Sequence, residues 1–390
     1  MFIDNSFEFM KSKLLLSIYL LNLCSKVSAQ AYYMHEAAED SNNGPLGGIL
    51  SLLVFIGIGI LIDKLWRKSD KEDDNDKYNY NDVGTSKNIH TKTDSAFIKE
   101  NGIPITRNNA TEIQSDAFLN CSNLTSFTIP ESVINIGRYA FAYCSNLRSI
   151  VIPNGVVKIG ECAFRGCSSL TSITIPESIS EIGAGAFERC SSLSAYYGKF
   201  ASTDNRCLII NDQIISFAPA NINNYTSLKG VTKIGEHAFS GCSNLTKITI
   251  SEGITNIGHC AFMNCSSLKS IIIPEGITEI KEYTFADCSN LTSFSIPEGV
   301  TKIGQNAFSG CSSLTNIYIP KSITTIDMYA FDNCYNLINT YIKSLVPPYF
   351  CNFGFPKCKI YVPSVSVNVY KTAYGWSDYA DCIIGYDFLE

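Results

Sequence analysis

A cysteine recurs every 23 residues along much of the chain and is the first feature that could carry chemistry. In the stretch AFRGCSSLTSITIPESI, Ala163 to Ile179, it is Cys167, followed by two serines and a run of β-branched residues. A recurring thiol could bind a metal, form disulfides, serve redox chemistry or fill a core. The series consists of Cys121, Cys144, Cys167, Cys190, Cys242, Cys265, Cys288, Cys311 and Cys334.

The regular spacing of this series argues against a metal cage and against disulfides. If each repeat is one coil of a parallel stack, neighbouring thiols lie about 4.8 Å apart. Zinc needs four ligands around one point at about 2.3 Å, which a line of thiols cannot supply. Parallel side chains also keep the Cβ atoms about 4.8 Å apart, beyond the mean of about 3.8 Å in a disulfide. We therefore predict unmodified thiols, each a small buried residue beside the phenylalanine of its coil.

Histidine offers one further metal candidate. His237 and Cys260 precede the Ala-Phe pairs of adjacent repeats, and stacking would bring them about 5 Å apart, close enough to share an ion. Other repeats place tyrosine, glycine or asparagine at this position, which favours a variable surface position. We expect no metal site here.

The sequence also lacks the motifs of common enzymes. It contains no GxSxG nucleophile elbow, no phosphate-binding glycine loop and no HExxH helix. Glutamates do recur with the repeat, which is typical of a solvated turn rather than of paired catalytic acids; they are Glu131, Glu177, Glu252, Glu275 and Glu298. We expect a protein that is not an enzyme and uses no cofactor.

Composition supports a folded chain that does not bind nucleic acid. The 390 residues are 45% hydrophobic and 17% charged, with a net charge of −6. Such apolar content suffices for a core. A nucleic-acid backbone requires a basic stripe, which a mildly acidic chain does not provide.

The elements that position the cysteines form a 23-residue repeat. Residues 124–146 read LTSFTIPESVINIGRYAFAYCSN, and further rows begin at Leu147, Leu170, Leu245, Leu268, Leu291 and Leu314. Within one row, Ile173 and Ile175 share one side of a strand, Pro176 ends it, and Gly183 permits a tight bend. Self-similarity at this period predicts a β-rich solenoid with parallel strands.

This row resembles the BspA-like leucine-rich repeat of bacterial and some protist surface proteins. The resemblance covers about Ile98 to Glu390, and the period, proline, glycine, Ala-Phe pair and cysteine all match together. It implies a right-handed leucine-rich-repeat coil and a role in adhesion at the cell surface.

The repeat region has an insertion and an atypical end. We predict a solenoid over residues 96–336 with an insertion at about 195–224. RCLII and QIISFAP flank Asn211-Asp212, as in a β-hairpin with a two-residue turn. The insertion could form part of a binding face or merely widen one coil. Residues 337–390 resemble the C-terminal cap of family members.

The first hundred residues suggest a leader and a membrane anchor. Residues 1–29 have basic residues, an apolar run and a small-residue cleavage site, as in a signal peptide. The apolar run at 46–62 predicts a short transmembrane helix, and residues 63–95 predict a flexible charged linker. Lys64, Arg67 and Lys68 then place the repeats on the cytoplasmic side if 46–62 spans, whereas the family resemblance implies the cell surface.

The outward strand positions are the candidate binding residues. They would form a flat surface that is rich in serine and threonine and poor in charge: Ser126, Thr128, Ser172, Thr174, Lys247, Thr249, Ser293, Ser295, Asn316 and Tyr318. Strand propensity alone could explain this composition, and so could a rigid platform. We expect a membrane-tethered protein that binds a protein or glycan through this surface and the hairpin. The alternative is a structural spacer or scaffold with no specific ligand.

Overall fold

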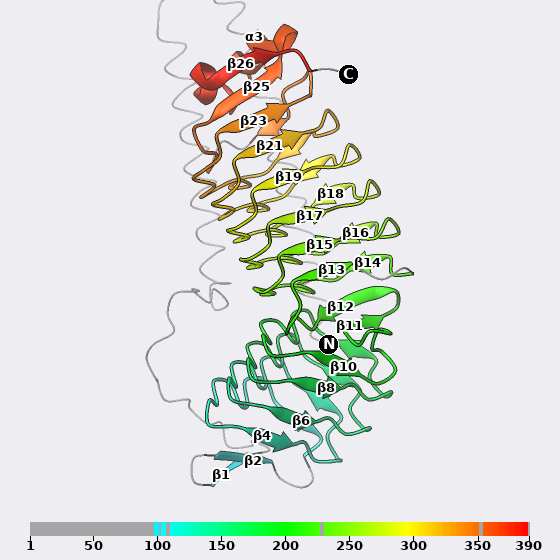
Figure 1. Cartoon of the computed structure of the whole chain (residues 1–390). Helices are drawn as coiled ribbons and strands as arrows, with labels where there is room; N and C mark the ends of the chain where they lie inside the picture. The colour runs from blue at the N-terminus through cyan, green and yellow to red at the C-terminus, as the bar shows by residue number, and fades with distance from the viewer. Residues whose placement is uncertain (1–96, 101–102, 107–109, 227–229, 351–353, 389–390) are drawn as a thin grey trace, which may run out of the picture. The chain divides into compact units, whose positions relative to one another are not determined.

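The computed structural model describes residues 97–100, 103–106, 110–226, 230–350 and 354–388 (Figure 1). All of them belong to one compact unit, Thr91–Glu390. The predicted leader (1–29), transmembrane helix (46–62) and linker (63–95) lie outside the described residues. Within the ranges given above, no helix has both the length and the apolar character needed to cross a bilayer.

The unit is a β-solenoid, which confirms the predicted repeat of about 23 residues with parallel strands (Figure 1). Its main strands stack coil upon coil and form what we call the first ladder. They are β4 (Ser126–Thr128), β6 (Ser149–Val151), β8 (Ser172–Thr174), β10 (Ala195–Tyr197), β13 (Asn224–Thr226), β15 (Lys247–Thr249), β17 (Ser270–Ile272), β19 (Ser293–Ser295), β21 (Asn316–Ile319), β23 (Asn339–Ile342) and β25 (Lys359–Pro363).

Each coil also carries a second, shorter strand that the sequence reading did not predict. These two-residue strands form the second ladder: β3 (Glu112–Ile113), β5 (Asn135–Ile136), β7 (Lys158–Ile159), β9 (Glu181–Ile182), β14 (Lys233–Ile234), β16 (Asn256–Ile257), β18 (Glu279–Ile280), β20 (Lys302–Ile303), β22 (Thr325–Ile326) and β24 (Tyr349–Phe350). Two residues are too short for the alternation that identifies a strand in sequence.

The core is a set of columns that run through the coils. The phenylalanine of each Ala-Phe pair stacks on the next, with ring centroids 5.3 Å apart from Phe141 to Phe164 and from Phe308 to Phe331. The central residue of most first-ladder strands, for example Ile150 and Ile248, and the isoleucine of most second-ladder strands, for example Ile136 and Ile257, are buried beside these rings. One coil alone cannot cover these side chains, so the fold depends on contacts between neighbours.

The repeated glycine serves close approach between coils rather than a bend. A Cβ atom on Gly160 would lie 2.6 Å from the backbone nitrogen of Arg138 in the preceding coil, and Gly137 and Gly183 are similarly crowded. None of these three glycines has a positive φ. The predicted turn does begin at Gly183, whose carbonyl accepts from Ala186 N at 3.3 Å, but the close approach of the preceding coil, and not the turn, is what requires glycine there.

The insertion contains the predicted hairpin and interrupts both ladders. β11 (Cys207–Ile210) and β12 (Gln213–Phe217) pair antiparallel, and both turn residues between them have positive φ, 50° at Asn211 and 57° at Asp212. β12 then pairs with β14, while β9 ends the sheet that begins at β3. The buried residues accordingly form two core clusters that divide within the insertion: Cys207 and Phe217 belong to the cluster of the later coils, and Leu208 and Ala218 belong to the cluster of the earlier ones.

The ends of the described region differ from the coils. At the start, β1 (Phe97–Glu100) pairs antiparallel with β2 (Ile103–Thr106). At the end, β25 leads into a 3-10 turn η1 (Ser364–Ser366), helix α3 (Val367–Thr372), a second 3-10 turn η2 (Ser377–Cys382) and strand β26 (Ile383–Tyr386), which pairs parallel with β25. Trp376 is fully buried there and donates to the Pro348 carbonyl at 2.8 Å.

Candidate binding surfaces

The outward positions of the first ladder form a continuous surface within each sheet, which we call the strand face. Of the ten predicted residues, the exposed ones are Ser126, Thr128, Thr174, Lys247, Ser293, Ser295 and Tyr318, and the half-buried ones are Ser172, Thr249 and Asn316. The register places Ser293 beside Asn316 and Ser295 beside Tyr318 on adjacent strands. The other six lie on β4, β8 and β15, in three separate sheets.

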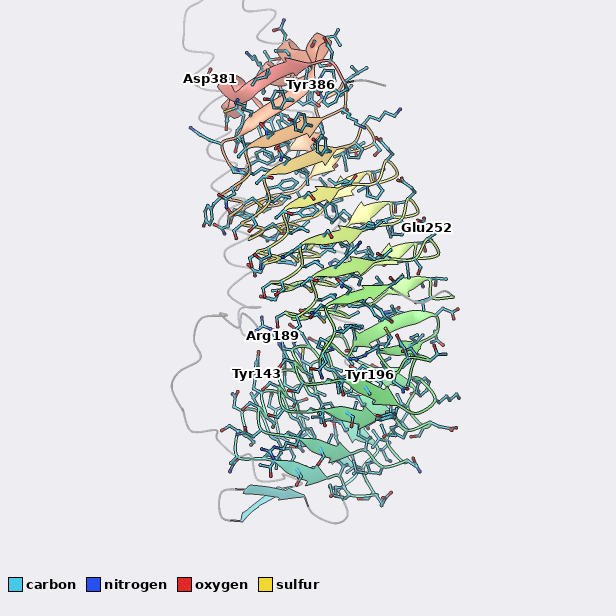
Figure 2. The ribbon with its side chains drawn as sticks, viewed as in Figure 1. Tyr143, Arg189, Tyr196, Glu252, Asp381 and Tyr386 are labelled. Atoms are coloured by element: carbon cyan, nitrogen blue, oxygen red, sulfur yellow. The ribbon has the colours of Figure 1, made fainter. Side chains whose placement is uncertain are left out.

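At its C-terminal end the strand face carries, beside the predicted Tyr318, three tyrosines that were not predicted from the sequence. Tyr318 stacks on Tyr341 with centroids 4.7 Å apart and planes 7° apart, and Tyr341 stacks on Tyr361 at 4.8 Å and 10°. Tyr386 meets both Tyr341 and Tyr361 edge-on at 5.6 Å. We call Tyr318, Tyr341, Tyr361 and Tyr386 the tyrosine row; Figure 2 shows Tyr386 at the end of the solenoid.

The surroundings of Tyr341 in the tyrosine row affect its acidity. Loss of hydration raises the pKa of Tyr341 first, and the neighbouring phenols raise it further because a phenolate would be repelled by theirs. A signal for the row existed in the sequence, since Tyr341 follows Tyr318 by one repeat. Tyr361 and Tyr386 follow at irregular intervals, which hid them.

Asparagines run beside the tyrosine row. The Asn339 side-chain amide donates to Asn316 Oδ1 at 2.7 Å, and the Asn316 amide donates to Thr315 Oγ1 at 3.0 Å. An amide side chain has four hydrogen-bonding positions, so these two bonds orient Asn316 without using all of them.

A buried charge cluster lies where the coils before and after the insertion meet; we call it the joint. The Glu188 side chain is fully buried and lies 3.3 Å from Arg165 Nε, 3.6 Å from Arg189 Nε and 3.4 Å from His237 Nδ1. Ser240 donates to Glu188 Oε1 at 2.9 Å, the oxygen that also faces Arg189, whereas Arg165 and His237 face Oε2. The contacts bring opposite charges together where water cannot reach, but Glu188 Oε2 and His237 Nδ1 make no hydrogen bond among the described residues, so the compensation is partial.

The joint corrects the expectation for His237. Its side chain is only 21% exposed, so the prediction of a surface position is wrong in this coil. Burial is the largest cause that lowers the pKa of His237, Arg165 lowers it further, and Glu188 opposes them. The sequence did hold a signal: Arg165 and Glu188 stand directly after the Ala-Phe pair, where Ala142, Ala286 and Ser309 are small.

The geometry around His237 also bears on metal binding. Its Nδ1 faces Glu188, and His259 pairs separately with Glu282, with Nδ1 at 2.6 Å from a carboxylate oxygen. Across the described ranges, no three His, Cys, Asp or Glu side chains gather in a geometry that could hold a metal ion.

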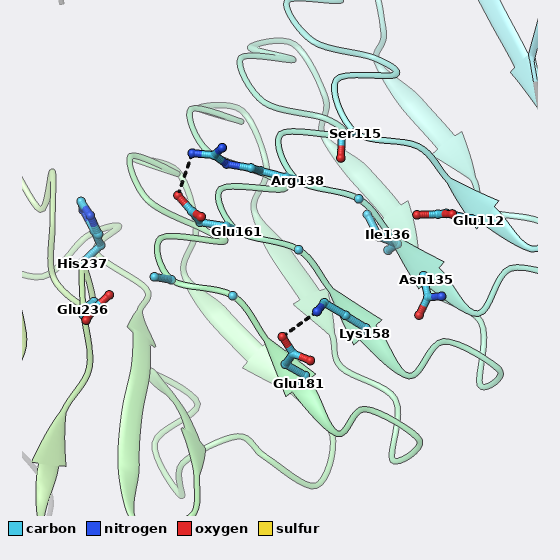
Figure 3. A pocket seen from close by; sticks show the side chains of 14 residues that line it. Glu112, Ser115, Asn135, Ile136, Arg138, Lys158, Glu161, Glu181, Glu236 and His237 are labelled. Carbon is cyan, nitrogen blue, oxygen red and sulfur yellow. Dashed lines mark hydrogen bonds and ion pairs between the residues drawn. The ribbon is translucent and has the colours of Figure 1, made fainter. Parts of the chain in front are cut away.

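A polar groove of about 700 Å³ runs along the second ladder from Glu112 to His237 (Figure 3). Arg138 and Glu161 pair across it at 3.3 Å, and Lys158 and Glu181 pair at 2.8 Å. These four side chains are about half exposed, so such pairs add little stability. Ser115 and His237 both line the groove, but the coils of Gly137, Gly160 and Gly183 lie between them, so they are not placed to act as nucleophile and base (Figure 3).

The cysteine series faces away from these surfaces. Apart from Cys121, which is partly exposed, its members are buried, and all are free thiols in the structure. Most of them donate to the phenylalanine carbonyl of the preceding coil, as Cys167 does to Phe141 and Cys311 to Phe285, each at 3.2 Å. Burial raises the pKa of Cys190 to about 12, which suppresses the reactive thiolate. The thiol thus packs beside the phenylalanine and also closes a hydrogen bond between coils.

The stacked coils, the leucine at the start of each and the buried thiol define a leucine-rich-repeat solenoid. The family described as BspA type leucine rich repeat region (6 copies) matches residues 84–205 and 210–338, more than half of the chain. The chain belongs to this family, which confirms the resemblance drawn from the repeat.

Solved structures of bacterial leucine-rich proteins are similar to this chain. A leucine rich cell surface protein from Faecalibacterium prausnitzii is 27% identical, with 63% of this chain and 86% of that chain covered and a TM-score of 0.41. A leucine-rich repeat protein from Bacteroides ovatus is 24% identical, with 75% and 91% covered and a TM-score of 0.40. The pneumococcal vaccine antigen PcpA is 20% identical, with 75% and 88% covered and a TM-score of 0.54. The last of these likenesses supports the fold. No curated protein matches the chain significantly.

Proposed function

We propose that this chain is a non-enzymatic binding protein of the cell surface that recognises a protein or glycan through its strand face. The observation that carries the proposal is the character of that face: large apolar side chains stand exposed among serines and threonines. Val151 is 64% exposed, and Ile272 and Tyr318 are each 51% exposed. Val151 and Ile272 stand singly on β6 and β17, whereas Tyr318 belongs to the tyrosine row, and apolar side chains that gather in this way on an otherwise soluble surface commonly mark an interaction site.

The rigid backbone beneath these side chains supports the proposal. The strands carrying Ile272 and Tyr318 are held by parallel hydrogen bonds to neighbouring coils, so binding would order little of the main chain. The ion-paired groove offers no comparable surface, because its charges already compensate one another.

Placement at the cell surface rests on the family resemblance, which implies adhesion there. The basic residues Lys64, Arg67 and Lys68 favour the opposite side if residues 46–62 span a membrane. Protease treatment of intact cells that express the full chain separates the two placements. We expect digestion of the repeats from outside; protection until the cells are lysed would contradict the surface placement.

Substitution of the strand face tests the binding role. We expect the double change Val151→Arg and Ile272→Arg to lower attachment of cells bearing the full chain to surfaces coated with serum proteins or mucin by at least about tenfold, because charge replaces two apolar contacts. Thr278→Arg, an exposed position outside the first ladder, is the matched control. Equal attachment by the double variant would favour a spacer without a specific ligand.

A further inference from the structure

The strand face changes height abruptly between β19 and β21. Ser295 and Tyr318 are in register on adjacent strands, so a large ring stands directly beside a hydroxymethyl group. Strands in a ladder lie about 4.8 Å apart, which is close to the thickness of one flat ring. We call this place the tyrosine step and define it by Ser293, Ser295, Asn316 and Tyr318.

The ring of Tyr318 has one covered side and one open side. Tyr341 stacks on it at 4.7 Å, from the direction of β23. On the β19 side the neighbour is Ser295, whose side chain is too small to cover a phenol ring, and Tyr318 remains 51% exposed. Tyr361 and Tyr386 pack behind Tyr341 and hold the row in place. The open side of the ring is therefore fixed before any ligand arrives.

Polar groups without charge flank the open ring. The Asn316 amide is oriented by Thr315 and Asn339 and keeps hydrogen-bonding positions beyond those two bonds. Ser293 and Ser295 are exposed on the adjacent strand. The outward positions on β17, β19, β21 and the first three residues of β23 carry no Asp, Glu, Lys or Arg; they are Ser270, Ile272, Ser293, Ser295, Asn316, Tyr318, Asn339 and Tyr341.

The hydrogen bonding of the strands limits which ligand fits. A peptide that binds by strand addition needs an open sheet edge. β21 is paired on both sides, with β19 and β23, so its main chain has no edge to offer at Tyr318. The nearest lysines in these columns are Lys247, beside Ser270, and Lys359, beside Asn339, and neither lies on β19 or β21. A charged ligand at the step itself would therefore lose water without gaining an opposite charge from those two strands.

We propose that the tyrosine step binds a neutral pyranose residue of a glycan. One face of such a ring presents C–H groups that pack on the open side of Tyr318, and its hydroxyls can bond to the Asn316 amide and the Ser293 hydroxyl. The tyrosine row acts as the support that keeps Tyr318 upright. This inference rests on the proposed function and assigns the strand face a ligand class and a position.

Calorimetric titration of the full chain with neutral hexasaccharides tests the proposal. The probes are cellohexaose, maltohexaose and mannohexaose, and hexagalacturonate is the charged comparison. We expect at least one neutral probe to bind and hexagalacturonate to bind at least about tenfold more weakly. Tyr318→Ala should weaken the neutral probe by about tenfold or more, because the stacking surface is lost. Tyr318→Phe keeps the ring and should stay within about threefold of the original affinity.

The controls separate this proposal from a structural effect and from the broader function. Tyr374 lies between α3 and η2, is 82% exposed and stands outside the strand face, so Tyr374→Ala should leave neutral-probe binding unchanged. Failure of all three neutral probes, or full binding by Tyr318→Ala, would overturn the glycan site. If attachment of the full chain to coated surfaces still depends on Val151 and Ile272 in that case, the proposed binding function stands with a protein ligand.

Discussion

The coils from Leu245 to Leu337 and the joint around Glu188 fill equivalent positions of the solenoid with different residues. In the regular coils, Phe285, Phe308 and Phe331 stack one on another, and each cysteine donates to the carbonyl of the coil before it. At the joint the stack of phenylalanine rings is interrupted. Phe187 packs edge-on against Tyr196, and a new stack begins with Phe217, which packs on Phe239. Figure 2 shows Arg189 and Tyr196 in this part of the molecule.

The difference shows what a repeat can and cannot do. A contact that recurs in every coil needs no special residue, because each coil packs on the next through the same surface. Where the insertion removes that match, the chain uses groups that occur once: a buried carboxylate, two arginines and a histidine. Tyr196 is likewise fully buried and bonds to Ser216 at 2.8 Å. The joint is therefore the place where the two core clusters could lose their coupling.

The largest expected effect belongs to the regular column. Phe308→Ala removes a fully buried ring stacked on both sides, and we expect the free energy of unfolding of its part of the chain to fall by about 3–5 kcal/mol. Hydrogen exchange of the full chain measures where protection is lost. We expect the loss to concentrate in the cluster after the insertion, and uniform loss across both clusters would mean that the joint couples them fully.

A somewhat smaller effect is expected at the joint itself. Glu188→Gln keeps the shape and a hydrogen bond to Ser240 but leaves the buried Arg165 without its counter-charge. We expect a loss of about 3 kcal/mol in denaturant unfolding. Glu181→Gln is the matched control, because its carboxylate pairs with Lys158 at the surface and should matter by less than about 1 kcal/mol. Equal losses in the two variants would contradict a special role for the joint.

The smallest effect is a pH dependence at the joint. Because burial lowers the pKa of His237, the unfolded chain takes up a proton near pH 6.5 that the folded chain resists. The free energy of unfolding should therefore fall as the pH drops below about 6.5 towards the lowered pKa of the folded state. The stability that depends on neutral His237 should be fully present above about pH 6.5. Arg165, Glu188, Glu236 and Glu161 are the charged groups that act on this imidazole.

Denaturant unfolding at pH 7.5 and 5.5 measures this dependence. His237→Gln should show a smaller difference between the two pH values than the original chain does. His259→Gln, at a half-exposed position paired with Glu282, controls for the loss of a histidine as such. If His237→Gln retained the whole pH difference, the lowered pKa would have no part in stability.

Much of the fold could be predicted from the sequence because the same pattern of side chains occurs in several repeats. Leu124, Ile173, Pro176 and Cys167 recur at fixed intervals, and stacking identical rows leaves parallel strands and a buried thiol line as the consequence. The hairpin was also readable, since Asn211 and Asp212 tolerate the positive φ that a two-residue turn requires. These features are local, or they repeat with the period.

Other features depend on contacts between residues that do not recur with the repeat, so they could not be predicted from its period. Glu188 contacts His237 because the coils before and after the insertion pack against each other, although the insertion separates them in sequence. Tyr361 and Tyr386 join the tyrosine row because the coil from β23 to β25 is shorter than a repeat and the C-terminal strand β26 pairs with β25. The sequence by itself determined the solenoid, through repeated side chains with one way to pack. Only the tertiary structure decided where the odd residues meet, because those contacts join parts of the chain that share no repeat position.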